Sequence, residues 1–321
     1  MSRRKPPVTV VVTVYNRAPY LASSLASVLA SRFEDFELLV LDNCSTDGSW
    51  EIAQDFARRD RRVRVVQNER NLGQFGNRNR VLDLVETRLF KFHDSDDLLY
   101  PHGLETLYRC LEQAPTADLV LSGGWAWEGG PCPMVLSPRE AYRREYLGRG
   151  LFYCGPASAL FKTESFRFVG GFEDHGAASD YLFWLRVCRT LTVALAPADL
   201  FWYRIHPNQE YASPAAAESY ARAQAEGWKA LFVPDCPLQG EDKEQARRNQ
   251  AFGLAKHTWR DLKAGRFSLA RLRLAEARFG WRDAWTYLRR QKRDAFAGTP
   301  RDADGEFLLP PWFKPEGPEA P

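Results

Sequence analysis

Val8-Thr-Val-Val-Val-Thr-Val14 runs directly into the turn Tyr15-Asn16-Arg17 near the start of the chain. All seven residues of the run are β-branched, and the run is too continuous for a half-exposed strand, so it is typical of a strand in the middle of a parallel sheet. After the turn, Leu21, Leu25 and Val28 recur at helical spacing. This stretch therefore predicts the first strand and the first helix of an α/β sheet.

The alternation of buried strand and helix continues to residue 92. Further strands are predicted at 36–42, 63–66 and 89–92, and the helices between them begin near residues 45 and 73. This order predicts a parallel, doubly wound α/β sheet, in which ligands bind at the carboxyl ends of the strands. The polar residues at those ends are Thr13, Tyr15, Asp42, Asn43, Asp94 and Asp96. Because they fall at one edge of the sheet, they predict a single nucleotide-binding site.

Three carboxylates follow the strand at 89–92, namely Asp94, Asp96 and Asp97. Carboxylates this close repel one another unless a cation lies between them. Mg²⁺ and Mn²⁺ prefer carboxylate oxygens and often keep a substrate phosphate among their ligands. In isolation, Asp-Ser-Asp-Asp fits a solvated turn or a helix N-cap. The nucleotide-type domain in front of it favours a metal site, and we assign Asp97 to the N-cap of the following helix.

Composition places the chain among ordinary globular proteins. It has 321 residues, of which 45% are hydrophobic and 26% charged. The six cysteines show no Cys-x-x-Cys pair, which excludes the usual zinc arrangements and predicts free thiols in a reducing compartment. The N-terminus is basic but leads into a strand, and no run approaches the roughly 18 apolar residues of a membrane span. We therefore expect a cytoplasmic protein.

The order of elements is less regular after residue 111. A strand is expected at 118–122, a turn at 154–158 before another strand, a helix at 181–187 and extended chain at 195–203. Segment 215–297 has helical spacing throughout. Residues 298–321 are rich in Pro, Gly and charge, which is typical of a disordered tail.

The helical segment is strongly basic. Residues 221–297 hold 17 Lys/Arg and 9 Asp/Glu, a net charge of +8. Such a segment can pack on the rest of the protein, rest on an anionic membrane or contact nucleic acid. Its Trp and Leu spacing favours packing, with Trp228, Leu231, Leu254, Trp259, Leu262, Leu269, Leu272, Trp281, Trp285 and Leu288 as core candidates. Peripheral contact with the inner face of the membrane stays open, whereas no nucleic-acid motif is present and no nucleic-acid partner is expected.

Four blocks of residues 8–210 resemble the family-2 glycosyltransferases of the GT-A fold. The blocks are 8–17 with its Tyr-Asn turn, 36–48 where the family usually shows Asp-Asp-Gly-Ser-Thr-Asp, 71–79, and 94–96 at the family's Asp-x-Asp. Any one block is weak, but four in order are specific. The resemblance implies a GT-A fold, an α/β doubly wound mixed sheet with an appended C-terminal helical region. We divide the chain into a nucleotide-sugar-binding half (1–110), an acceptor-binding half (111–214), the helical region (215–297) and the tail (298–321).

The resemblance implies an enzyme that moves a sugar from a nucleotide diphosphate donor to a hydroxyl acceptor with inversion, using Mn²⁺ or Mg²⁺. Tyr15 would stack on the base, and Asp42 with Asn43 would line the base and ribose. Asp94 would meet the ribose or a metal-bound water, and Asp96 would coordinate the metal. The other donor-binding candidates are Thr13, Asn16 and Arg78.

Two later blocks carry the remaining roles. Residues 178–186 resemble the acceptor-side block, in which an acidic pair usually precedes Tyr/Trp-Leu-x-Arg. Here the first acid is replaced by Ser179, so Asp180 is the expected catalytic base. Residues 202–206 resemble the family's Tyr-Arg-x-His, which assigns His206 to the metal and diphosphate. His93 and His102 have no such support and are expected to be structural.

Two alternatives remain beside the transferase. A nucleotidyltransferase usually opens with a Gly-rich phosphate loop, and the turn at 15–18 contains no glycine. A non-catalytic nucleotide-sugar-binding module is disfavoured because Asp94, Asp96 and Asp180 are all retained.

The donor base is predicted from Asn43. Its amide offers one acceptor and one donor, which suits uracil or thymine better than guanine and predicts a UDP- or dTDP-sugar. The acceptor, whether glycan, lipid-linked or protein, stays open, as does the oligomeric state. Synthesis of polysaccharide, cell-surface glycan or glycolipid is the expected setting.

Overall fold

The computed structural model describes residues 5–123, 132–148, 150–206 and 214–280. The strands are β1 (Val8–Val14), β2 (Phe36–Asp42), β3 (Val63–Gln67), β4 (Leu89–Asp94), β5 (Leu98–Leu99), β6 (Leu119–Ser122), β7 (Met134–Leu136), β8 (Ala159–Lys162), β9 (Val193–Ala196) and β10 (Phe201–Trp202). The helices are α1 (Ala18–Leu29), α2 (Ser49–Arg59), α3 (Gln74–Asn79), α4 (Val81–Leu84), α5 (Gly103–Gln113), α6 (Pro138–Leu147), α7 (Thr163–Val169), α8 (Ser179–Val187), α9 (Pro214–Lys229), α10 (Gly240–Lys263) and α11 (Phe267–Ala277).

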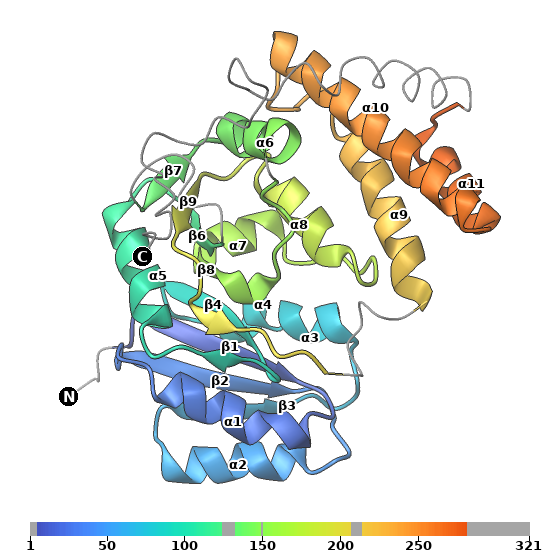
Figure 1. Cartoon of the computed structure of the whole chain (residues 1–321). Helices are drawn as coiled ribbons and strands as arrows, with labels where there is room; N and C mark the ends of the chain where they lie inside the picture. Colours follow the sequence, from blue (N-terminus) through green and yellow to red (C-terminus); the bar gives the residue numbers. More distant parts are fainter. Residues whose placement is uncertain (1–4, 124–131, 149, 207–213, 281–321) are drawn as a thin grey trace, which may run out of the picture.

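One mixed sheet runs through both halves of the α/β region (Figure 1). Its strand order is β3-β2-β1-β4-β8-β6-β9-β7. The first four strands are parallel, β8 is antiparallel to both β4 and β6, and β6 is parallel to β9. The mixed α/β sheet that the family resemblance implies is confirmed, whereas the wholly parallel sheet predicted from the strand pattern alone holds only for β1 to β4.

Helices cover both faces of this sheet. One apolar core joins it to α1 and α5 through residues such as Leu21, Leu25, Leu104 and Leu107. The core on the other face is rich in phenylalanine and joins β4 and β8 to α7 and α8, with Phe90, Phe92, Phe161, Phe166, Phe183 and Trp184. The sheet is therefore doubly wound, as the alternation of strands and helices predicts.

The register of β1 places the polar strand ends side by side. Thr13 lies between Leu41 of β2 and Asp94 of β4, and Val14 pairs with Asp42. Parallel strands that end together leave their following loops at one edge of the sheet. The carboxyl ends of β1, β2 and β4 thus form one border, from which the site is built.

Two local predictions in this region are wrong. The helix expected from residue 73 to 84 is two helices, α3 and α4, which meet at Arg80. Asp97 does not cap α5, because α5 begins at Gly103 and its N-cap residue is His102. Strand β5 lies between Asp97 and α5 in the sequence, and it pairs with β10.

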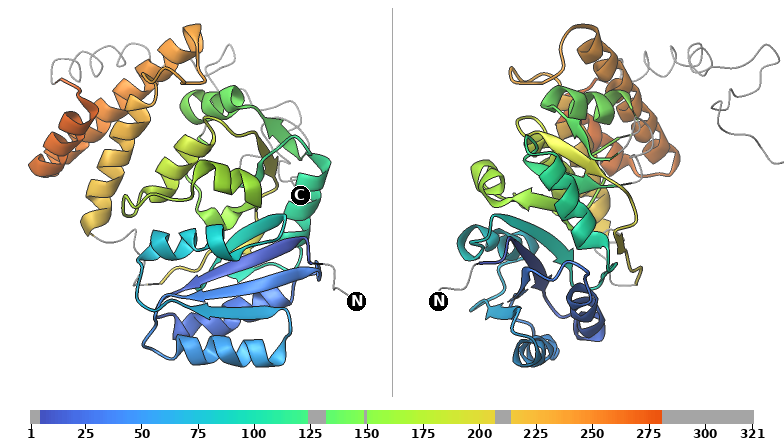
Figure 2. Two further views of the ribbon diagram at one scale, coloured as in Figure 1. Left: turned by 180° about the vertical axis from the view of Figure 1, so that it is seen from behind. Right: turned by 90° about the vertical axis from the view of Figure 1, so that its left-hand side faces the viewer.

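Helices α9–α11 form a third unit beside the acceptor half (Figure 2). A small apolar core holds these three helices together. Its buried residues are Ala225, Ala251, Leu254, Ala255, Leu274, Ala277 and Phe279. Trp228 packs against this core and Leu231 is buried, but Trp259 is 43% exposed, so its assignment to the core is wrong. Trp281, Trp285, Leu288 and the tail at 298–321 lie outside the described residues. Among the helices that the structure describes, none has the length and apolar character needed to cross a bilayer.

Candidate active site

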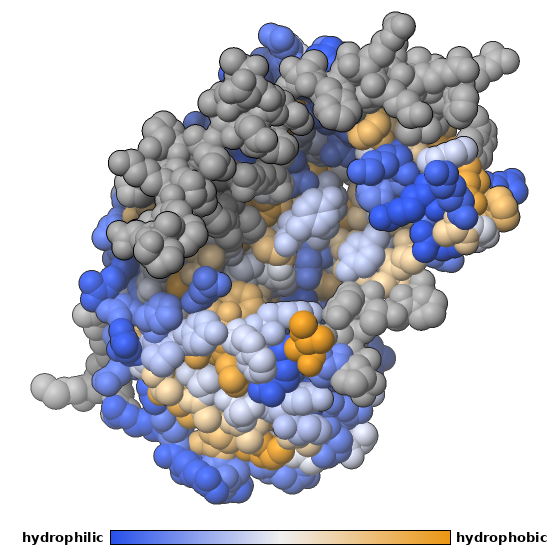
Figure 3. All heavy atoms as spheres, in the orientation of Figure 1, coloured by the Kyte–Doolittle hydropathy of each residue, from blue (hydrophilic) through white to orange (hydrophobic). Residues whose placement is uncertain are grey.

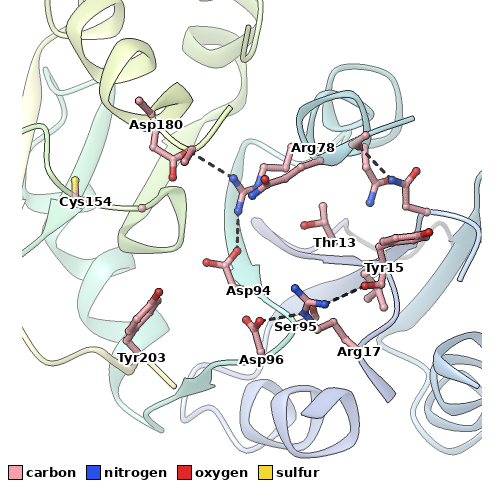
Figure 4. Close-up of a pocket in the computed structure, with 18 of the residues that line it drawn as sticks. Thr13, Tyr15, Arg17, Arg78, Asp94, Ser95, Asp96, Cys154, Asp180 and Tyr203 are labelled. Carbon is pink, nitrogen blue, oxygen red and sulfur yellow. Dashed lines mark hydrogen bonds and ion pairs between the residues drawn. The ribbon is translucent and has the colours of Figure 1, made fainter. Parts of the chain in front are cut away.

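A cavity of about 760 Å³ opens at the carboxyl ends of β1, β2 and β4. It lies between the two halves of the α/β region, and Tyr220 of α9 also lines it. Figure 4 shows Thr13 and Tyr15 on one side of Asp94, and Asp180, Cys154 and Tyr203 on the other. Of the residues predicted from the sequence, the cavity is lined by Thr13, Tyr15, Asn43, Arg78, Asp94, Asp96 and Asp180. Those that do not line it are Asn16, Asp42 and His206.

Arg78 joins the two sides of the cavity by contacting a carboxylate on each. Its Nη2 lies 2.9 Å from Oδ1 of Asp94, and its Nη1 lies 3.5 Å from Oδ1 of Asp180. The side chain is nearly buried, with its guanidinium 5.6 Å from the Phe75 ring and 6.0 Å from the Phe172 ring. A buried guanidinium is always charged, so Arg78 offsets the repulsion between the two carboxylates.

Asp180 lies in the first turn of α8 but does not cap it. The N-cap residue is Ala178, and it makes no side-chain capping bond. Ser179 binds the preceding turn, accepting from the backbone N–H of His175 and donating to the carbonyl of Gly176. The Asp180 side chain is about one-third exposed and faces Arg78 in the cavity. A carboxylate in the first turn is stabilised as an anion by the helix dipole, which suits a general base.

Asp96 and His206 meet at the donor side. Oδ2 of Asp96 lies 3.0 Å from Nε2 of His206 and 3.1 Å from Nε of Arg17. The His206 ring stacks on Tyr20, with the ring centroids 4.8 Å apart. Arg17 is not among the site residues predicted from the sequence, although it follows Tyr15 and Asn16 directly.

A carboxylate and an imidazole in contact fit a divalent ion, because both are ordinary ligands of Mn²⁺. Asp94, also predicted as a ligand, instead directs Oδ1 to Arg78. Within the described residues, no group of three or more His, Cys, Asp or Glu side chains lies close enough to hold a metal. Of the predicted ligands Asp94, Asp96 and His206, the structure brings Asp96 and His206 into contact, whereas Asp94 pairs with Arg78.

Asp97 holds the segment that carries His206. Its Oδ1 accepts the backbone N–H of Arg204 at 3.0 Å, and Arg204 Nε donates to the carbonyl of Asp96 at 2.7 Å. Asp97 is almost fully buried, and burial together with the charge of Asp94 raises its pKa to about 7. Its role is to dock β10 and the following residues against the Asp-Ser-Asp turn.

Asn43 does not present a free amide to the cavity. Its Nδ2 donates to Oδ1 of Asn71 and to the carbonyl of Gly73, and its Oδ1 accepts from Nδ2 of Asn68 and the N–H of Leu72. Both amide hydrogens and both lone pairs are thus used within the protein. The base preference predicted from a free Asn43 amide loses its basis, and Asn43 instead shapes the loop at 68–73.

Asn16 supports a neighbouring loop in the same way. It adopts a left-handed backbone conformation (φ 52°), which asparagine tolerates, and its Oδ1 accepts the N–H of Thr46 at 2.9 Å. Its backbone N–H donates to Oγ of Ser45. In the structure Asn16 links the loops after β1 and β2 and does not line the cavity.

Asp42 keeps one oxygen without a partner. Its Oδ2 accepts from the N–H of Ser45 and from Nε2 of Gln67, whereas its Oδ1 is buried and has no hydrogen-bond partner within the part of the chain that the structure describes. A buried acceptor without a donor is costly, and Asp42 itself does not line the cavity, although the next residue, Asn43, does.

The side of the cavity opposite Thr13 and Tyr15 is an aromatic wall that includes Phe152, Tyr153 and Tyr181. Glu145 of α6 is buried, and its Oε2 accepts the N–H groups of Leu151 and Phe152 at 2.7 and 3.0 Å. Nε1 of Trp184 donates to the carbonyl of Cys154 at 2.6 Å. Burial raises the pKa of Cys154 to about 12, so its thiol is no nucleophile at neutral pH.

Comparison with known proteins agrees with this architecture. The profile described as glycosyl transferase family 2 matches residues 9–170, which is half of the chain. The chain belongs to glycosyl transferase family 2. This membership favours the glycosyltransferase over both alternatives, the nucleotidyltransferase and the non-catalytic module.

Curated relatives are also glycosyltransferases. An uncharacterized glycosyltransferase of Methanocaldococcus jannaschii is 28% identical over 219 residues, which are 65% of this chain and 74% of that protein. TuaG of Bacillus subtilis, named for teichuronic acid biosynthesis, is 37% identical over 97 residues, which are 30% of this chain and 38% of TuaG. The chain is therefore a glycosyltransferase.

Solved structures share the fold at low identity. TarS of S. aureus in complex with UDP-GlcNAc has a TM-score of 0.61 at 20% identity, over 80% of this chain and 75% of TarS. The mannosyltransferase PcManGT of Pyrobaculum calidifontis, in complex with GDP-Man and Mn²⁺, has a TM-score of 0.59 at 19% identity. The match covers 91% of this chain and 81% of PcManGT. The GT-A fold is shown by these likenesses.

Proposed function

We propose that this glycosyltransferase is metal-dependent and inverting, and that Asp180 is its base. One observation carries the proposal: Arg78 connects Asp94, on the donor side, to Asp180, on the acceptor side, across one cavity. An inverting transfer needs a carboxylate that faces the acceptor hydroxyl from the side opposite the departing diphosphate. Asp180 is the carboxylate on that side of the cavity.

The chemistry assigned to the residues is a single displacement. Asp180 takes the proton of the acceptor hydroxyl as its oxygen bonds to the anomeric carbon, and the bond from that carbon to the diphosphate oxygen breaks. Arg78 lies where it can contact the negative charge that grows on the diphosphate. Once the hydroxyl binds Asp180, the long 3.5 Å contact with Arg78 is the one to loosen.

Asp96 and His206 are the proposed ligands of Mn²⁺ or Mg²⁺. When bound, the ion supplies Lewis-acid neutralisation of the leaving nucleotide diphosphate. Arg17 shares the same carboxylate oxygen of Asp96, so it balances that charge before an ion enters. A structural neighbour that holds GDP-Man with Mn²⁺ supports this assignment.

The donor is proposed to be a UDP- or dTDP-sugar, on the basis of Asp42 rather than Asn43. Uracil and thymine have one ring N–H between two carbonyls, which matches the single unpartnered oxygen of Asp42. Guanine presents two adjacent donors and would need both oxygens, but Oδ2 already binds Ser45 and Gln67. Tyr15, which is 45% exposed at the cavity, is the proposed stacking platform for the base.

The names of relatives such as TuaG support synthesis of a cell-surface polysaccharide as the setting. Contact of residues 215–297 with an anionic membrane remains a prediction, to be checked by binding to anionic liposomes at low salt.

Asp180→Asn is the direct test of the proposed base. Asparagine keeps the size and most contacts of the side chain but cannot take a proton. We expect transfer to fall by roughly 10² to 10⁴ while nucleotide affinity and the circular dichroism spectrum are unchanged. Asp174→Asn, an exposed neighbour in the preceding turn, is the control. Near-normal transfer by folded Asp180→Asn would overturn the assignment.

A further inference from the structure

The acceptor half of the cavity carries two exposed tyrosines from distant segments. Tyr153 follows α6 and is 73% exposed, and Tyr220 lies on α9 and is 43% exposed. Both line the cavity that contains Asp180. Exposed aromatic rings at a cavity wall are costly to maintain in water and are typical of places where a ligand covers them.

The protein fixes the loop on which Tyr153 is presented. Glu145 binds the two N–H groups before it, and Trp184 binds the carbonyl of Cys154 after it. The Tyr153 ring lies 5.1 Å from the ring of Tyr181. Because the loop is held on both sides, little ordering entropy is lost when a ligand packs against Tyr153.

Tyr220 is fixed from a different direction. The neighbouring Ser219 donates to the carbonyl of His175 and accepts the N–H of Ala178, which is the N-cap residue of α8. Gly227, two turns later on the same face of α9, lies so close to Tyr181 that a Cβ there would be 2.6 Å from its hydroxyl. Helix α9 is thereby locked to the N-terminus of α8, two residues from Asp180.

The charge of this wall selects the class of acceptor. On the side of the cavity that carries Asp180, the described lining residues are mainly aromatic or small, and none of them is a lysine or an arginine. The two arginines that line the cavity, Arg17 and Arg78, contact Asp96 and the Asp94–Asp180 pair. Among the described residues on the side of Asp180, a phosphate-bearing acceptor would meet no lysine or arginine, and Asp180 would repel it.

We infer that Tyr153 and Tyr220 bind a neutral saccharide as the acceptor, and that the C-terminal helical region completes the acceptor site. This inference rests on the proposed function of the same cavity. The C–H face of a pyranose ring is flat and apolar, so it gains buried area and dispersion contacts against a tyrosine ring while its hydroxyl groups stay hydrated. Figure 3 shows the face of the molecule hollowed between the C-terminal helices and the lower body.

The first experiment compares acceptor classes. The holoenzyme with Mn²⁺ and a donor that it hydrolyses is given neutral mono- and disaccharide glycosides, glycerol-phosphate and ribitol-phosphate oligomers, and Ser/Thr peptides. We expect transfer to neutral glycosides and none to the phosphate oligomers. The inference would be overturned if the enzyme preferred the phosphate oligomers or the peptides. It would also be overturned if no neutral glycoside were glycosylated and none bound to the protein by NMR. Absence of donor turnover even by hydrolysis would instead refute the proposed function.

The second experiment tests the two tyrosines. Tyr153→Ala and Tyr220→Ala are expected to raise the KM for the glycoside acceptor roughly tenfold each, with the donor KM and acceptor-independent nucleotide release unchanged. Tyr153→Phe and Tyr220→Phe keep the ring and should stay within about twofold of the parent protein. Trp259→Ala removes an equally exposed aromatic ring of α10 outside the cavity and is the control. An unchanged acceptor KM in the Ala variants, or a parallel rise in donor KM, would contradict the assignment.

Discussion

One carboxylate oxygen, Oδ2 of Asp96, contacts both Arg17 and His206. We expect Asp96→Ala to abolish turnover with any divalent ion while the fold is kept, because the charged ligand is lost. Binding of Mn²⁺ in the presence of UDP, measured by electron paramagnetic resonance, should also be lost in this variant. Asp55→Ala, which removes a carboxylate that pairs with two arginines on α2, is the control. Full turnover in excess chelator would remove the metal from the mechanism.

The buried, unpartnered oxygen of Asp42 predicts the nucleotide preference. UDP is expected to bind more tightly than GDP in calorimetry, and Asp42→Asn should weaken UDP by roughly tenfold or more, because a charge-assisted hydrogen bond is lost. Gln67→Ala removes a partner of Oδ2 and leaves Oδ1 in place, so it should weaken UDP less. Tighter binding of GDP than of UDP would contradict the role given to Asp42.

At the residue scale, the sequence predicted which types of side chain gather at the strand ends but not how each is used. Strand ends are set by local pattern, so Thr13, Tyr15 and Asp94 could be placed at one edge. Whether an amide is free depends on neighbours such as Asn68 and Asn71, whose loop conformation no pattern fixes. The position of Asn43 at the cavity was therefore predictable from the sequence, but its hydrogen bonds were not.

At the scale of elements, α6 carries two glutamates with opposite surroundings. Glu140 closes a capping box with Ser137, and those hydrogen bonds lower its pKa. Glu145 is buried, and burial raises its pKa above the ordinary 4.5. Because its pKa is raised on folding, the contribution of Glu145 to stability is fully present below pH 4.5 and is lost as the pH rises through the folded-state pKa. For Glu140 the stability is present above its ordinary pKa and is lost on acidification.

The two sites therefore give predictions of opposite sign. Glu145→Gln keeps an oxygen for Leu151 and Phe152, so its free energy of unfolding relative to the parent protein should increase as the pH rises from 4.5 towards neutrality. Glu140→Gln should instead gain stability relative to the parent as the pH falls below 4.5, because the parent protein then loses the contribution of its ionised carboxylate. Urea denaturation at several pH values measures both, and a Glu145→Gln variant whose relative stability falls with rising pH would contradict the burial argument.

The elements themselves were largely predictable where the pattern was strong. The largely apolar and buried runs of β1 and β2 match the predicted bounds, since a buried parallel strand has few solvent-facing positions to interrupt the run. Helix α6 was missed although Ser137-Pro138-Arg139-Glu140 carries the capping-box signal. The break at Arg80 and the pairing of β5 with β10 depend on tertiary contacts, which one short segment does not reveal.

At the scale of the whole molecule, the proposed acceptor wall combines residues of the segment after α6, of α8 and of α9. Tyr153 and Tyr220 are far apart in the sequence and belong to no motif, so only the packing of α9 on α8 brings them to one cavity. The same packing gives the basic C-terminal helices a role within the enzyme. Much of their charge is paired locally, as in the contacts of Asp261 with Arg266 and Arg273.

The central claim is that the cavity transfers a sugar from a nucleotide diphosphate donor with inversion. The most direct measurement is a screen of UDP-, dTDP-, GDP- and CDP-sugars with Mn²⁺, which records nucleotide release and then, by NMR, the anomeric configuration of the product. We predict turnover of a UDP- or dTDP-sugar, an inverted linkage, and loss of both in Asp96→Ala. Failure of the folded protein to release nucleotide from any donor, or a product with retained configuration, would contradict the account.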